Sequence, residues 1–509
     1  MTPKAPLYWL TWLGTALVAL TISGLLLDVP ARTGDVRFLR VSMLVGLLAF
    51  SAGIYFAAVR LILRHTWPRC TIWIVLGVAT ALRGLLLTEP PVLSSDIYRY
   101  VWDGRVQAAG INPYRYRPAD PALASLRDAI IYPQINRASY ARTIYPPVAQ
   151  LVFGGVGRIW DSVTGMRLAI LGFEAIGVVC LLGLLPLAEL PRERILIYAW
   201  NPLALWSFAS DGHVDAISIG LLGLALLLRA RHKDGWAGAA LAGAVLTKFV
   251  PLVVAPAFVR GGRFWRPALA GLTVIGCGYA LYSSAGWHVF GFLLSYGQEE
   301  GIDSGHGIWL LAGLAHLIKL PPVAPIAYAG CIALIFLALA AIILRRRTPS
   351  NDVQALCRDT GILAAAAMVA TSPHYHWYFA WLALPAAVAP SRALLWLATA
   401  PIVLIQEPVP GDRFFWPSLV YVPALLLLLA DLRPWLAIKR RRGDEIGETP
   451  CPLQLPSRIH ADTSRRSVPI APASPDSCRC ASISRSPTAA TCSAKPARAH
   501  STNSNLPLI

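Results

Sequence analysis

The feature that most constrains this chain is a series of long apolar runs, which recur from residue 7 to residue 433. A helix needs about 20 consecutive apolar residues to cross the hydrocarbon core of a bilayer. Only 14% of the 509 residues are charged, whereas a soluble protein carries about 25%. The runs are continuous rather than alternating, which disfavours a β-barrel. The sequence therefore predicts an all-α polytopic membrane protein.

The apolar runs predict a bundle of about 12 transmembrane helices. The expected spans are 7–27, 41–63, 71–88, 167–189, 195–210, 213–230, 267–285, 323–344, 355–371, 377–390, 392–406 and 416–433. The run 236–259 carries Lys248 and Pro251 at its middle, so we expect a broken, re-entrant pair of short helices there. Residues 146–160 begin with Pro-Pro and are expected to be interfacial or re-entrant.

Basic residues gather in short clusters between the apolar runs, at 64–69, 191–194, 229–233, 260–263, 345–347 and 439–442. Lys and Arg favour the cytoplasmic side of short loops, so these clusters are expected in the cytoplasm. They account for much of the net charge of +18, which therefore does not indicate nucleic acid. The motif-like polar segments then fall on the opposite, outer face, at 89–145, 211–215, 287–306, 372–378 and 406–416.

The composition changes abruptly after Arg442, where a basic stretch rich in Ser and Pro begins. Such a segment cannot bury a core. We therefore expect a transmembrane domain over residues 1–436, with a large periplasmic loop at 89–145, and a disordered cytoplasmic tail over 437–509. The cysteines show no ligand-like spacing, and those of the apolar part are expected to be small packed hydrophobes.

Two aspartates follow the third expected span. Charged groups near membrane depth are costly and often mark a site, so Asp96 is a candidate catalytic carboxylate. Ser94-Ser95-Asp96 is also a good helix start, and a capping role stays open. Asp103 lies seven residues later, on the same face of a helix. It could orient Asp96 or a substrate hydroxyl, or it could pair with Arg99 one turn away.

The end of the large outer loop is rich in aromatic and basic residues. Residues 110–118 could stack on sugar rings and bind phosphate, or they could anchor the loop at the lipid headgroups. Arg142 and Tyr145, in the stretch 142–147, could contact a lipid phosphate. Arg142 could instead only extend its charge to the membrane surface.

The turn 211–215 places Asp211, His213 and Asp215 within five residues. These side chains could bind acceptor hydroxyls or a divalent cation. A polar hairpin turn is the alternative, because spacing alone does not show that ligands converge. The metal question therefore stays open.

Three further polar residues lie in apolar surroundings. Lys248 needs a partner within its apolar segment, and a lipid-linked phosphate would be suitable; extension to the surface is the alternative. His374 and His376 lie among five aromatic residues in 373–381. That stretch fits a sugar-binding platform as well as an interfacial aromatic belt.

The ordered set of these motifs resembles the GT-C superfamily of membrane glycosyltransferases. It is most similar to the bacterial mannosyltransferases that depend on polyprenol-phosphate mannose. The segments that carry the resemblance are SDIYRYVWDG (95–104), GINPY (110–114), IYPP (144–147), WNPLAL (200–205), DGHVD (211–215), AGAVLTKFVPL (242–252) and SPHYHWY (372–378). Many superfamily members pair two acids in the first loop, whereas Asp96 and Asp103 are seven residues apart here.

The resemblance implies a GT-C-like bundle with a large first outer loop. It implies that Asp96 is the catalytic base and that Lys248, Arg142 and Tyr145 bind the donor phosphate. Further candidate substrate-binding residues, proposed from the residues themselves, are Asp103, Asp211, His213, Asp215, His374 and His376.

The expected reaction moves a hexose, expected to be mannose, from a polyprenyl-phosphate sugar to a cell-envelope glycan or lipid by inverting displacement. The expected location is the bacterial inner (plasma) membrane, with the active site on the periplasmic face. Membrane lipids are expected partners and nucleic acid is not. No cofactor is certain, and a divalent cation could take part. Broken helices and a Lys at membrane depth also fit a transporter or flippase, which stays the alternative function.

Overall fold

A computed structural model describes residues 4–29, 34–260, 264–346 and 352–444. The described residues form helices and no strand. The predicted class, a polytopic helical membrane protein, is therefore confirmed. The chain divides into two units, Met1–Gly447 and Glu448–Ile509. The predicted tail lies outside the described residues from residue 445 onward, and the description that follows concerns the first unit.

The helices vary widely in length. Those of ten residues or more are α1 (Lys4–Leu25), α2 (Asp35–Arg64), α3 (Thr71–Leu87), α4 (Asp96–Ala108), α5 (Pro147–Ile159), α6 (Val163–Leu187), α9 (Asp215–Ala230), α10 (Asp234–Val245), α12 (Trp265–Ala280), α15 (Ala324–Arg345), α16 (Val353–Thr371) and α19 (Phe415–Asp444). The shorter α-helices are α7 (Leu196–Ala199), α8 (Pro202–Leu205), α11 (Ala255–Phe258), α13 (Leu293–Glu299), α14 (Trp309–Ala315), α17 (Ala383–Val388) and α18 (Arg392–Leu397). Between them lie the 3-10 segments η1 (Pro121–Leu126), η2 (Tyr132–Gln134), η3 (Arg192–Ile195), η5 (Val250–Val254), η6 (Ser283–Phe290), η7 (His376–Leu382) and η8 (Ala400–Ile405), and the π-helical turn η4 (Trp206–Ser210).

Six helices in the described part of the chain are long and apolar enough to cross a membrane. They are Pro6–Leu25, Asp35–Arg64, Val163–Leu187, Ala324–Arg345, Val353–Thr371 and Phe415–Pro434. The bent pair Trp265–Ala280 and Ser283–Glu299 would make a seventh. The other expected spans are shorter or broken. For example, the run 195–210 consists of η3, α7, α8 and η4, because Asn201 caps a new helix at Pro202.

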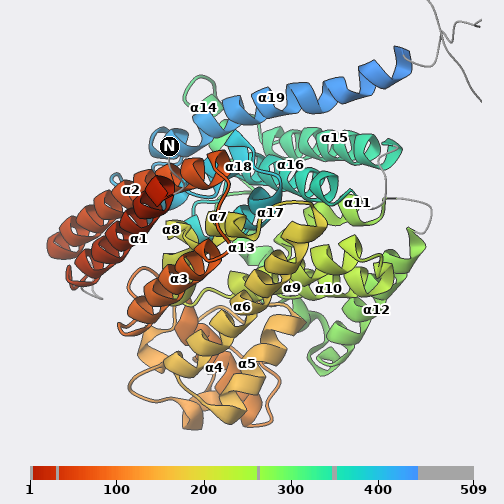
Figure 1. The fold of residues 1–509 in the computed structure, drawn as a ribbon. Coiled ribbons are helices and arrows are strands. Elements are labelled where there is room, and N and C mark those ends of the chain that lie inside the picture. Colours follow the sequence, from red (N-terminus) through yellow and green to blue (C-terminus); the bar gives the residue numbers. More distant parts are fainter. Residues whose placement is uncertain (1–3, 30–33, 261–263, 347–351, 445–509) are drawn as a thin grey trace, which may run out of the picture. The chain divides into compact units, whose positions relative to one another are not determined.

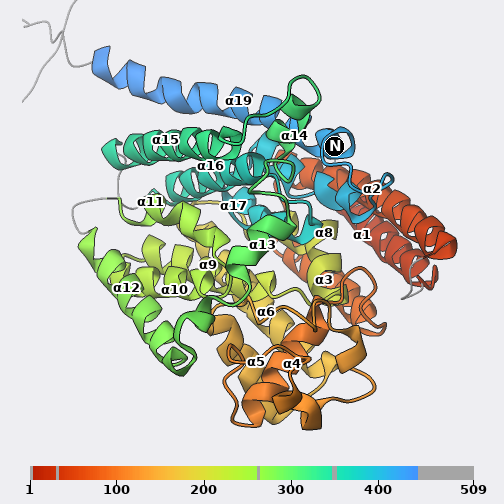
Figure 2. The same cartoon turned by 180° about the vertical axis from the view of Figure 1, so that it is seen from behind.

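The helices pack in three groups that both ribbon views show (Figure 1, Figure 2). Helices α1, α2 and α3 lie together, and α6, α9, α10 and α12 follow one another as a central layer. Helices α15, α16 and α19 lie side by side. Most buried apolar residues form one continuous core through these groups, and Tyr114, Tyr282 and Ala285 form a second, small cluster.

The large outer loop is held by a tight pair of helices, α4 and α5. Gly104 on α4 faces Gly157 on α5, and a Cβ at either position would collide with the backbone of the other helix. Only glycine allows backbones to approach so closely. This contact fixes α4, and with it Asp96 at its first residue, against the segment that begins at Pro147.

The run 236–259 is broken, as its Lys and Pro predict. Helix α10 ends at Val245, and η5 begins at Val250 with Pro251 in its first turn. The carbonyl of Leu246 accepts a hydrogen bond of 2.9 Å from the N–H of Val148, at the start of α5. The break therefore brings Lys248 beside the large outer loop.

Candidate active site

A cavity of about 360 Å³ joins the large outer loop to the broken run. Its polar lining includes Ser94, Ser95, Asp96, Arg99, Asn136, Arg137, Arg142, Asp215, Thr247 and Lys248. Its apolar and aromatic lining includes Tyr100, Tyr145, Val214, Phe249, Val250, Phe292, Leu293, Tyr296, Tyr375, Trp377 and Tyr378. Of the ten site residues predicted from the sequence, five line this cavity and five do not. The five that line it are Asp96, Arg142, Tyr145, Asp215 and Lys248. We refer to this space as the Asp96 cavity.

Asp96 lies at the first residue of α4, and its carboxylate faces this cavity. The side chain of Asn136 donates a hydrogen bond of 3.0 Å to Oδ1. Nδ1 of His213 lies 4.0 Å from Oδ2. Burial raises the pKa of Asp96 above its ordinary value, and the Asn136 hydrogen bond and the charge of Lys248 offset part of that rise. A carboxylate held this way suits a general base.

The capping role that stayed open for Asp96 is not what the carboxylate does here. Ser95 occupies the N-cap position of α4, and no side chain caps this helix end. The N–H of Asp96 itself donates to Oγ of Ser94, at 3.2 Å. Asp96 is therefore the first helical residue, and its carboxylate is left for the cavity.

Lys248 reaches the cavity from the break between α10 and η5. Its Nζ lies 2.7 Å and 2.9 Å from the two carboxylate oxygens of Asp215. The same ammonium lies 3.5 Å from the ring centroid of Tyr378, a cation–π contact. Asp215, at the start of α9, is thus the partner that Lys248 needs in the absence of an anionic ligand.

Arg142 and Arg137 add positive charge to the cavity wall. Nε of Arg142 donates to the carbonyl of Arg115, at 3.2 Å. Arg137 pairs with Glu299 at the end of α13, at 2.5 Å. Tyr375 donates to the neighbouring Glu300, at 2.9 Å. With Lys248 and Arg99 they give the lining four cationic side chains, beside the two carboxylates of Asp96 and Asp215.

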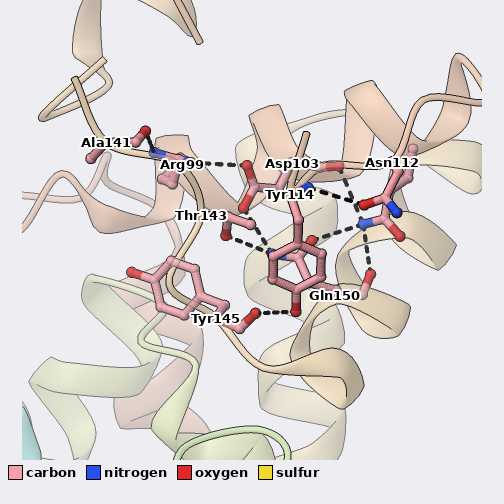
Figure 3. Close-up of polar contacts among 9 residues, drawn as sticks. Arg99, Asp103, Asn112, Tyr114, Ala141, Thr143, Tyr145 and Gln150 are labelled. Atoms are coloured by element: carbon pink, nitrogen blue, oxygen red, sulfur yellow. Dashed lines mark hydrogen bonds and ion pairs between the residues drawn. The ribbon is translucent and has the colours of Figure 1, made fainter. Parts of the chain in front are cut away.

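Tyr145 lines the cavity within an aromatic cluster. Its ring meets Tyr100 edge to face at 4.9 Å, and Tyr100 stacks on Phe153 at 4.7 Å. Tyr114 donates to the carbonyl of Tyr145, at 2.6 Å (Figure 3). The GINPY turn therefore fixes the backbone of the stretch 142–147.

Asp103 lies outside the cavity lining, in a closed hydrogen-bond network (Figure 3). Its Oδ1 accepts from Nε of Arg99 at 2.8 Å, which is the salt bridge left open by the sequence. Its Oδ2 accepts from Gln150 at 2.9 Å. Gln150 also bonds with Thr143, at 2.7 Å. Arg99 in turn donates to the carbonyl of Ala141, so the network fastens α4 to the stretch that carries Arg142.

The three polar side chains of the turn 211–215 have different surroundings, and that of Asp215 pairs with Lys248. Asp211 accepts hydrogen bonds from the N–H groups of Val92 and Leu93, at 3.1 Å and 3.0 Å. Burial raises the pKa of Asp211 to about 7, against the lowering effect of those bonds. His213 is buried beside Asp96, and its ring stacks on Trp377 at 3.9 Å. Burial lowers the pKa of His213 well below its usual range, so its ring is neutral.

His374 and His376 line a different cavity, of about 240 Å³. Leu93, Tyr375 and Trp377 line both this space and the Asp96 cavity. Trp377 stacks on Tyr375 at 4.8 Å and on His213 at 3.9 Å. Burial lowers the pKa of His376 to about 3 and that of His374 to about 4. Both rings are therefore neutral, and neither lines the Asp96 cavity.

Metal ligands do not converge among the described residues. They contain no group of three or more His, Cys, Asp or Glu side chains that could hold a metal ion. Asp211 is engaged with the backbone of 92–93 and Asp215 with Lys248. The described residues therefore give no support for a cation bound by the turn 211–215.

Several residues of the cavity were missed by sequence reasoning. Asn136 and Arg137 lie in an irregular part of the loop, with no period or motif around them. Tyr296 and Tyr378 gave only an aromatic signal that an interfacial belt also explains. The pairing of Asp215 with Lys248 joins positions 33 residues apart, which spacing in the sequence does not reveal.

One of three comparisons with known proteins finds a match. Residues 12–261 match the N-terminal domain of the alpha-(1->6)-mannopyranosyltransferase family. No curated protein and no solved structure matches the chain. The matched range includes α4, the turn 211–215 and Lys248, and all ten polar residues named above in the lining of the Asp96 cavity lie within it. This match supports a mannosyl-transferring membrane glycosyltransferase of the GT-C type.

Proposed function

We propose that the protein transfers mannose from a polyprenyl-phosphate sugar to an acceptor of the cell envelope, by a single inverting displacement. One observation carries this proposal: a single cavity joins the Asp96 carboxylate, the cations Lys248 and Arg142, and an apolar wall. A base, a phosphate-binding cation and an apolar surface are what a lipid-linked sugar donor requires at one place.

In the proposed step, an acceptor hydroxyl attacks the anomeric carbon of the mannosyl group. A new carbon–oxygen bond forms as the bond from that carbon to the phosphate oxygen breaks, and the polyprenyl phosphate leaves with the electron pair. Asp96 takes the hydroxyl proton. The displacement inverts the anomeric carbon, so the donor and the product have opposite anomeric configurations.

The cations of the cavity wall would stabilise the leaving phosphate. Lys248 and Arg142 line the cavity together, and preorganised charges of this kind act strongly on a departing anion. Lys248 is held by Asp215 in the structure, so the phosphate would share or replace that partner. Tyr145 lines the same wall and is proposed to contact the phosphate through its hydroxyl.

The apolar part of the wall is proposed to receive the first units of the polyprenyl chain. Phe249 and Val250 come from the broken run, and Phe292 and Leu293 from the start of α13. When the donor phosphate lies at the level of the lipid headgroups, its polyprenyl chain can enter the hydrocarbon layer beside such residues. The site is therefore proposed to lie at the outer, periplasmic surface of the bacterial inner membrane.

The proposal is tested with radiolabelled polyprenyl-phosphate sugars and membranes from cells with and without the gene. We expect mannose transfer only with the gene, and slower or no transfer from the glucose, galactose and arabinose donors. The anomeric configuration of the product is read by NMR and is expected to be opposite to that of the donor. Retained configuration would contradict the single displacement.

The proposed face is tested in the same assay with sealed vesicles. A soluble, membrane-impermeant mannoside acceptor is offered to right-side-out and to inverted vesicles that both contain the donor. Only right-side-out vesicles are expected to transfer mannose to it. Transfer only in inverted vesicles would place the site on the cytoplasmic face and contradict the proposal.

A further inference from the structure

A second cavity, of about 480 Å³, adjoins the Asp96 cavity. Leu93, Ser94 and Ser95 line both spaces. These residues immediately precede Asp96 in the chain, so the two cavities meet beside the carboxylate. We call this second space the Gln134 cavity, after a residue that lines it and not the other.

The segment shared by the two cavities is fixed by its neighbours. Asp211 accepts from the N–H groups of Val92 and Leu93, and Arg37 donates to the carbonyl of Val92 at 3.0 Å. Asn136 donates to Oδ1 of Asp96, and its amide also lies 3.4 Å from Oγ of Ser95. A group bound in the Gln134 cavity would therefore find the Asp96 carboxylate at a defined place.

The two cavities differ in charge. The Asp96 cavity is lined by four cationic side chains, those of Arg99, Arg137, Arg142 and Lys248, which outnumber its two carboxylates, Asp96 and Asp215. Among the described residues that line the Gln134 cavity, Arg37 is the one Arg or Lys, and it is engaged with Val92.

The rest of the polar lining of the Gln134 cavity is uncharged or acidic. Ser94, Ser95, Tyr98 and Gln134 offer hydroxyl and amide groups, and Asp28 and Glu89 offer carboxylates. Such a lining can donate to and accept from hydroxyl groups, but it offers little to a phosphate. It therefore suits a neutral, hydroxyl-rich ligand.

We propose that the Gln134 cavity binds the acceptor as a short stretch of neutral glycan, with one hydroxyl directed across Ser94 and Ser95 to Asp96. This inference rests on the proposed function, because a transferase must bring two substrates to one base. The donor then occupies the cationic cavity and the acceptor the neutral one. Asp96 lies where the two meet.

The cavity of His374 is the competing acceptor site. It also carries polar groups, among them Gln406 and Glu407. However, of the segment 93–95 that leads to Asp96, only Leu93 lines that space, whereas Leu93, Ser94 and Ser95 all line the Gln134 cavity. The Gln134 cavity therefore adjoins the residues next to Asp96 more closely.

The test begins with binding, which does not require transfer. A soluble α-linked mannose disaccharide that carries a photoreactive diazirine is irradiated with the purified full-length protein, and the labelled peptides are mapped by mass spectrometry. We expect saturable labelling of residues 89–98 and of the segment around Gln134, suppressed by excess unlabelled disaccharide. Labelling of 404–417 instead, or labelling that does not saturate, would overturn the proposal.

A kinetic arm uses variants of exposed or half-buried side chains that should fold. Gln134→Ala and Tyr98→Phe are each expected to raise the KM for the disaccharide roughly 3–10-fold, the loss of one hydrogen bond. Their KM for polyprenyl-phosphate mannose should stay within about twofold of wild type. Gln406→Ala, in the cavity of His374, is the matched control and should change neither constant. A raised donor KM in Gln134→Ala would contradict the assignment.

The two arms separate this inference from the proposed function. Labelling at the Gln134 cavity by a wild-type protein that transfers no mannose would leave the glycan site standing and contradict the proposed function. Normal mannose transfer together with labelling at 404–417, or with an unchanged acceptor KM in both variants, would leave the function standing and overturn the acceptor site.

Discussion

Helix α4 carries two aspartates, two turns apart, with opposite surroundings. The side chain of Asp103 is 2% exposed, and both its oxygens have protein partners. The side chain of Asp96 is 22% exposed and lines a cavity, with one direct hydrogen bond from Asn136 to its carboxylate. A buried carboxylate with all its bonds made stabilises a fold, whereas one with free acceptor capacity toward a cavity can act on a ligand.

The largest expected effect on stability comes from Asp103, the structural one of the two aspartates. Asp103→Ala leaves the Arg99 guanidinium buried without its carboxylate, and it also removes a partner of Gln150. Breaking a buried pair in this way costs about 3–5 kcal/mol. Thermal unfolding of the purified protein is expected to shift accordingly, while Asp96→Asn should change stability by less than about 1 kcal/mol. Equal losses of stability in Asp103→Ala and Asp96→Asn would contradict the distinction between a structural Asp103 and a reactive Asp96.

A smaller effect is expected on the catalytic efficiency, and it should differ between the two cations proposed to bind phosphate. Lys248→Gln is expected to lower kcat/KM for the lipid-linked donor by roughly 10²–10³-fold, as for a preorganised charge in a transition-state site. Arg142→Gln should cost roughly 10-fold, because its side chain is more exposed and is screened by water. Steady-state kinetics with polyprenyl-phosphate mannose measures both. Arg266→Gln, on α12 and outside the cavity lining, is a matched control that should have no effect.

The pH dependence of transfer sharpens the comparison further. A base must be deprotonated to act, so kcat/KM falls as the pH falls through the pKa of Asp96. Burial raises that pKa, so the acid limb should lie above the ordinary range of an aspartate. Asn136→Ala removes a hydrogen bond that lowers the pKa, and it should move the limb to higher pH. A limb that stays in place in Asn136→Ala would contradict the role of this hydrogen bond.

The smallest expected effect concerns Asp211, which has no place in the cavity lining. Its pKa is raised to about 7, so the folded protein binds a proton that the unfolded chain releases near pH 4. Asp211 therefore favours folding at low pH, and this contribution is lost as the pH rises toward 7. Asp211→Asn keeps an acceptor for the N–H groups of Val92 and Leu93 and should remove that dependence. Asp211→Ala should instead destabilise at all pH values, by about 1–3 kcal/mol.

The sequence predicted the class and the break in the run 236–259, since apolar length and a mid-run Lys and Pro are local signals. It left the role of Asp103 open, because seven-residue spacing allows both a shared helical face and a salt bridge with Arg99. Tertiary contact decided that question, through Gln150 and Thr143 on another segment.

Other features could not be read from the chain. Asn136, in an irregular part of the loop, reaches Asp96 from 40 residues further along the chain. His374 and His376 share a motif with Trp377, yet Trp377 lines the Asp96 cavity and the two histidines do not. Twelve expected spans became six long helices with shorter pieces between them, since caps and prolines inside apolar runs end helices early.

The most direct test measures mannose transfer by Asp96→Asn and Asp103→Asn, each normalised to folded protein. With polyprenyl-phosphate mannose as donor, Asp96→Asn is expected to be roughly 10²–10⁴-fold slower than wild type. The folded fraction of Asp103→Asn should transfer within about 10-fold of wild type, since Asp103 has no contact with the cavity. Wild-type transfer by Asp96→Asn would contradict the account, because Asp96 would then not be the base.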